Sequence, residues 1–131
     1  TGTGHIDITG SGNFTHVEVS GNIEYHASKP AITTDSDGAT VTFNMDTSDT
    51  HTVVLGGNRT LALSNTDAGQ KFIIRLTQDG TGSRTVNWFS TIKWPGGLVP
   101  TLTTTASKTD VFGFICTSAG NYDGFVIGYN L

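Results

Sequence analysis

Apolar side chains recur at every second position through the last two thirds of the chain, and this period most constrains how it folds. Alternate residues of a strand point to one face, so each such segment predicts a strand with one buried face. The apolar positions are Val41, Phe43 and Met45; Leu61 and Leu63; Phe72, Ile74 and Leu76; Phe112, Phe114 and Cys116; and Phe125, Ile127 and Tyr129. No segment carries the i, i+3, i+4, i+7 stripe of an amphipathic helix over ten residues. The sequence therefore predicts an all-β fold.

Glycine-containing turns separate these segments. Gly56-Gly57-Asn58, Asp79-Gly80-Thr81-Gly82 and Gly120-Asn121 each stand between two predicted strands, as the turns of β-hairpins do. Turn signals at intervals of roughly ten residues are typical of sandwiches and jelly rolls. We therefore expect residues 39–131 to form a jelly-roll-like antiparallel β-sandwich.

The first 27 residues differ from the rest because they contain a near-repeat. The hexapeptide His5 to Gly10 (HIDITG) is matched by His16 to Gly21 (HVEVSG). Two short strands with one apolar face each do not stay folded alone. That face packs either on the chain's own sheet or on identical copies about a three-fold axis, and the regular glycine punctuation favours the second. We expect residues 1–27 to form a glycine-punctuated β stem or attachment segment, and residues 28–38 to form a linker.

Composition and charge exclude several classes of function. Only 14% of the residues are charged, against about a quarter in typical domains. The formal charge is −4 and the seven Lys and Arg are scattered, so we expect no nucleic-acid partner. No apolar stretch approaches the roughly 20 residues of a membrane span, so we expect no membrane insertion. The single cysteine, Cys116, lies in an apolar run and is expected to be a buried, inert thiol.

Catalytic patterns are missing from the sequence. A glycosidase needs two paired acids, yet the only glutamates are Glu18 and Glu24, both near the N-terminus. Most aspartates stand beside Gly or Ser, as turn residues do, and no Gly-x-Ser-x-Gly nucleophile motif occurs. We predict a protein that is not an enzyme and has no cofactor. A weak metal hypothesis concerns His5 and His16, which would stack as imidazole rings in a parallel trimer, although both alternate with apolar residues and are more simply read as exposed.

Four residues are candidates for ligand binding: Trp88, Trp94, Tyr122 and Asp123. Indole and phenol rings can stack on a sugar, and a neighbouring carboxylate can orient its hydroxyl groups. The competing interpretation is packing, because Trp94 precedes the turn Pro95-Gly96-Gly97 and both tryptophans can serve as core or corner residues.

One long ordered motif gives the chain a family resemblance. It comprises Gln78 to Trp88 (QDGTGSRTVNW), Lys93 to Gly97 (KWPGG), Pro100 to Thr103 (PTLT) and Asp110. The motif resembles a β-module of bacteriophage virion surface proteins, of the tail-fibre and minor structural protein type. The resemblance implies β-structure, frequent homotrimers and a location on the virion surface, and it carries over no catalytic residue. Within the motif, Arg84 follows the glycine turn and is expected to bond an acid such as Asp79 or Asp110.

These observations lead to one expected function and one alternative. The expected function is that of a non-catalytic virion surface protein, of fibre, tip or capsid-decoration type, that acts as a homotrimer by display and adhesion or by bracing. Its expected partners are other virion proteins or a host surface glycan. The alternative is a carbohydrate-binding module of an extracellular protein.

Overall fold

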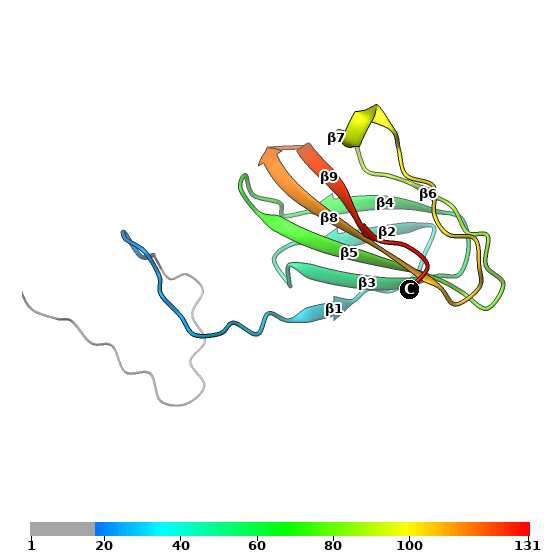
Figure 1. Cartoon of the computed structure of the whole chain (residues 1–131), viewed down its shortest axis with the longest axis horizontal. Helices are drawn as coiled ribbons and strands as arrows, with labels where there is room; N and C mark the ends of the chain where they lie inside the picture. The colour runs from blue at the N-terminus through cyan, green and yellow to red at the C-terminus, as the bar shows by residue number, and fades with distance from the viewer. Residues whose placement is uncertain (1–17) are drawn as a thin grey trace, which may run out of the picture.

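The computed structural model describes residues 18–131, and it consists of two β-sheets packed face to face (Figure 1). The long sheet has the strand order β1-β3-β5-β8-β9-β7 and the short sheet the order β2-β4-β6. The long sheet comprises β1 (Ile32–Thr34), β3 (Thr50–Leu55), β5 (Lys71–Gln78), β7 (Ile92–Lys93), β8 (Thr109–Ser118) and β9 (Asn121–Gly128). The short sheet comprises β2 (Thr40–Asn44), β4 (Arg59–Ser64) and β6 (Val86–Asn87), and one 3-10 turn spans Pro95–Gly97. The predicted all-β, sandwich-like character is confirmed.

The prediction of antiparallel pairing throughout is wrong. From β1 to β6 the chain alternates between the two sheets, so each strand pairs in parallel with the strand two before it. This winding is that of a short β-solenoid rather than the antiparallel order of a jelly roll. Within residues 18–131, antiparallel pairing is confined to β5 with β8 and β8 with β9. The physical reason is that the first two glycine turns carry the chain across the core from one sheet to the other, and only Gly120-Asn121 closes a hairpin.

The core lies between the two sheets and follows the predicted alternation. Its buried members include Val41, Phe43, Met45, Leu61, Phe72, Ile74, Leu76, Phe112, Phe114 and Cys116. Burial of Cys116 is thus confirmed. The last strand departs from the pattern: β9 buries Tyr122 and Gly124, whereas Phe125, Ile127 and Tyr129 are exposed.

The range expected to be a linker belongs partly to the body. Ile32–Thr34 is strand β1, which pairs in parallel with β3. The next residues are held by side chains of the body: Asp35 Oδ2 lies 2.9 Å from His51 Nδ1, and Asp37 forms an ion pair with Arg59. The body therefore begins at β1, and residues 18–31 form an exposed segment, called here the arm, that contains no strand or helix. Figure 1 shows the arm leaving the body at the β1 edge.

Candidate functional site

Three of the four predicted ligand-binding residues come together, but they do so inside the protein. Trp94 and Tyr122 are buried, and Trp88 is partly buried against the same core. The rings of Trp88 and Trp94 lie 5.1 Å apart, and Trp88 also packs edge-on against Phe112 at 4.8 Å. The Tyr122 hydroxyl reaches Thr66 Oγ1 at 3.1 Å, so its polar end is satisfied internally. The expectation of ligand stacking on Trp94 and Tyr122 is corrected to core packing, because neither ring has an open face.

The other predicted site residues lie elsewhere. Asp123 is partly exposed on the outer face of the long sheet, in register with Ile115 on β8 and Lys93 on β7. The histidines of the metal hypothesis, His5 and His16, lie outside the described residues. Within residues 18–131, no three or more His, Cys, Asp or Glu side chains gather in a cluster that could hold a metal ion.

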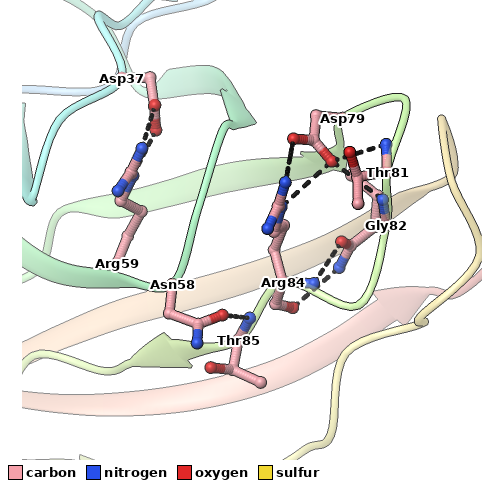
Figure 2. A network of polar contacts seen from close by, with 9 residues as sticks. Asp37, Asn58, Arg59, Asp79, Thr81, Gly82, Arg84 and Thr85 are labelled. Carbon is pink, nitrogen blue, oxygen red and sulfur yellow. Dashed lines mark hydrogen bonds and ion pairs between the residues drawn. The ribbon is translucent and has the colours of Figure 1, made fainter.

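The motif residues of the Asp79–Arg84 turn form a polar network where the chain crosses between the sheets (Figure 2). The Arg84 guanidinium donates to the Asp79 carboxylate, with Nη2 at 2.7 Å from Oδ2, which confirms one of its two expected partners. The same carboxylate accepts from the backbone N–H groups of Thr81 and Gly82. The Gln78 amide bonds both the N–H and the carbonyl oxygen of Arg84. This density of bonds fixes the turn and assigns Arg84 and Asp79 a structural role.

A second ion pair braces the neighbouring turn. Arg59 at the start of β4 donates to both carboxylate oxygens of Asp37, at 2.8 and 2.6 Å (Figure 2). Asn58 Oδ1 accepts from the backbone N–H of Thr85, which ties this turn to the Asp79–Arg84 turn. The hydrogen bond from Arg59 holds the pKa of Asp37 below its ordinary value. The two turns therefore form one rigid end of the body.

Acid should remove the stability that the Asp79 carboxylate contributes at this end of the body. The hydrogen bond from Arg84, followed by that from the Gly82 N–H, lowers the pKa of Asp79 from 3.8 to about 2. A lowered carboxylate pKa stabilises the fold above the unfolded value, and the effect is lost as the pH falls through the folded value. We expect Asp79→Asn to lower the melting temperature by a few degrees above about pH 5, and this difference to vanish toward pH 2.

Melting curves across this pH range, followed by circular dichroism, measure the effect. Arg84→Ala should produce the same loss near neutral pH, because it removes the other half of the pair. Asp67→Asn is the matched control, since Asp67 is exposed and its substitution should leave melting unchanged. Equal melting of wild type and Asp79→Asn at neutral pH would contradict the structural role of the pair.

Among the exposed apolar side chains of residues 18–131, two groups bear on the sequence predictions. The arm exposes Val19, Ile23 and Tyr25, in the segment expected to need a partner. The outer face of the long sheet exposes Phe125 and Ile127, which the period-two pattern had suggested as a buried set. The sequence signal for exposed apolar residues in β9 is the run Phe125-Val126-Ile127. Because neighbouring residues of a strand point to opposite faces of the sheet, these three side chains cannot all point into the protein core. What these surfaces offer is contact rather than chemistry.

Known proteins supply no further guide to this site. The chain matches no family model, no curated protein and no solved structure. Across residues 18–131, none of the helical segments combines the length and the apolar character needed to cross a membrane.

Proposed function

We propose that this chain is a non-catalytic structural protein of a phage virion surface, of fibre, tip or capsid-decoration type, that works as a homotrimer. The observation that carries the proposal is the arm, whose apolar side chains alternate with polar ones and stand exposed beside a rigid β body. An apolar strip of this kind gains free energy when a partner covers it. The partner class and the virion surface come from the motif resemblance, and the motif residues hold turns and core as a scaffold module requires.

Multiple copies give such a protein its mechanism. Three bodies held by their N-terminal segments present three equal surfaces, so weak contacts to other virion proteins or to a host surface glycan multiply by avidity. Bracing and adhesion both follow from this geometry without any chemical step. The carbohydrate-binding module is the weaker candidate, because the aromatic rings on which it depended, Trp94 and Tyr122, are buried.

Native mass spectrometry of the full chain tests the assembly. We expect the dominant species to have about three times the subunit mass of 13.8 kDa, since the apolar strips of the arms need cover. Gold-labelled antibody against residues 39–131 should then decorate intact particles in electron micrographs. A dominant 13.8 kDa species, or particles that bind no antibody, would contradict the proposal.

A further inference from the structure

The arm presents an apolar strip that its own body leaves uncovered. Val19, Ile23 and Tyr25 are 48–66% exposed, and Glu18, Asn22 and Glu24 occupy intervening positions. In an extended chain alternate residues share one side and lie about 6.6 Å apart. The chain bends at Ser20-Gly21 and at His26, and between these bends Ile23 and Tyr25 alternate with Asn22 and Glu24. In an extended conformation the arm would be apolar on one side and acidic on the other, and it leads away from the body (Figure 1).

The body carries a groove that such a segment fits. The groove has a volume of about 280 Å³ and lies on the outer face of the long sheet, where Ile73, Ile115 and Phe125 line it with Pro30 at its margin. Ile73, Gly113 and Phe125 are direct neighbours in register across β5, β8 and β9. Because Gly113 has no side chain, the side chains of Ile73 and Phe125 stand two strands, roughly 10 Å, apart. A branched apolar side chain can pack in the groove against Ile73, Ile115 and Phe125.

Ile127 fills the space directly above Gly113. A Cβ atom placed on Gly113 would lie 3.0 Å from Ile127 Cδ1, so the Ile127 side chain already reaches over this glycine. Ile127 is nevertheless 57% exposed. The outer-face groove is thus apolar on its floor and on both flanks, and the short sheet, which covers the inner face, leaves it open.

Charge complements shape at this groove. Lys71 and Arg75 are exposed on β5 on either side of Ile73, and neither forms an ion pair with the residues that the structure describes. The arm contributes Glu18 and Glu24, and lysine and arginine side chains are long enough to reach the edges of a segment lying between them. Asp49 also lies at the rim, with its Oδ1 accepting from Gln70 Nε2 at 2.9 Å.

We propose that the arm of one copy lies in the outer-face groove of a neighbouring copy, with Ile23 packed against Ile73, Ile115 and Phe125. The inference rests on the self-association of the proposed function and names the surfaces that carry it. The occupant is a second copy because each chain's own arm meets its groove only at Pro30. The rest of the arm then runs away from the body with its apolar strip exposed (Figure 1). Each body then receives one arm and donates one, as a closed ring of identical copies requires.

Cysteine cross-linking between co-expressed chains tests the contact. One chain carries Ile23→Cys and an affinity tag, and the other carries Ile73→Cys; the native thiol of Cys116 is buried and does not compete. A disulfide forms only when the two Cα atoms come within about 7 Å. We expect mild oxidation to yield about ten-fold more tagged–untagged disulfide than two controls. These controls pair Asn22→Cys, from the polar side of the arm, with Ile73→Cys, and Ile23→Cys with Thr42→Cys on the exposed face of the short sheet.

A groove variant adds a readout that does not depend on the cysteine positions in the arm. Phe125 is 43% exposed, so Phe125→Glu should keep the circular dichroism spectrum of the fold while its charge repels the acidic arm. Placed in the Ile73→Cys chain, it should lower the cross-link yield about ten-fold. An unchanged yield in a folded variant would overturn the groove as the docking site.

Two other outcomes separate this inference from the proposed function. If the mass remains trimeric but Ile23→Cys chains cross-link to each other, with Ile73→Cys at control level, the arms meet around an axis. The groove contact is then overturned while the trimer stands. If the wild-type chain is a monomer, both fail.

Discussion

Replacing His51 by alanine should cost about 3–5 kcal/mol of unfolding free energy. His51 is fully buried on β3, in register with Thr33 of β1, and both of its ring nitrogens face oxygen atoms. Nδ1 lies 2.9 Å from Asp35 Oδ2, and Nε2 lies 3.0 Å from the Ser48 carbonyl oxygen. Both ring nitrogens thus have a polar partner, since Nε2 can donate to that carbonyl and Nδ1 faces the carboxylate. Alanine would leave a carboxylate and a carbonyl without their partner, beside an empty volume next to Phe43.

Urea unfolding followed by tryptophan fluorescence measures this loss. A loss of this size is a large share of the stability of an ordinary domain, about 5–15 kcal/mol, and corresponds to a fall in melting temperature of more than about 10 °C. Asp35→Asn should cost less, since an amide can donate to a neutral imidazole and keeps the shape of the side chain. His26→Ala, in the exposed arm, is the matched control and should melt as wild type does. A His51→Ala loss no greater than that of His26→Ala would refute this account of the β1 anchor.

The part of the fold that the sequence predicts is the part set by local periodicity. Alternation at Val41 to Met45 and at Phe72 to Leu76 correctly identified strands and their buried faces. The connectivity did not follow, because a glycine turn between two apolar segments has the same local chemistry whether it reverses the chain within a sheet or carries it to the opposite one. Here hydrogen bonds to Asp79 from Gly82 and Arg84 stabilise the turn that carries the chain from one sheet to the other. The sequence predicted that Arg84 pairs with an acid such as Asp79, but it did not predict that this pair holds a turn between the two sheets.

The candidate site shows the same division between local and long-range information. Alternation in the N-terminal segment predicts that it needs a partner, and this stays a prediction; the structure shows that the apolar side chains of the arm are exposed. Ligand stacking on Trp94 was not ruled out by the sequence, because the burial of Trp94 depends on close approach to Gly124, a residue 30 positions away. The groove itself depends on the register that sets Ile73, Gly113 and Phe125 side by side. No window of the sequence displays that row, since it runs across three strands.

Gly82→Ala should be the most damaging glycine substitution in the motif, with an expected loss of more than about 3 kcal/mol. Gly82 has φ +75°, a conformation that costs a residue with a Cβ about 1–2 kcal/mol. A Cβ here would lie 2.5 Å from the Thr104 carbonyl oxygen and 2.8 Å from the Ala106 nitrogen, both backbone atoms. The Thr104 carbonyl cannot simply retreat, because it accepts from the N–H of Ser83 at 2.8 Å. The turn would have to open, which also strains the bond from the Gly82 N–H to Asp79.

Two other glycines separate the causes of this loss. Gly69 has φ +89° but open space around it, so Gly69→Ala should show the conformational cost alone, about 1 kcal/mol. Gly80 lies in the same turn as Gly82, with open space and no positive φ, and Gly80→Ala should change the free energy of unfolding by less than about 0.5 kcal/mol. The expected order of loss in urea unfolding is Gly82, then Gly69, then Gly80. If Gly82→Ala loses no more stability than Gly69→Ala, the backbone at Thr104 moves to accommodate the added Cβ atom. The close contact with Thr104 would then not explain why this position of the motif holds glycine.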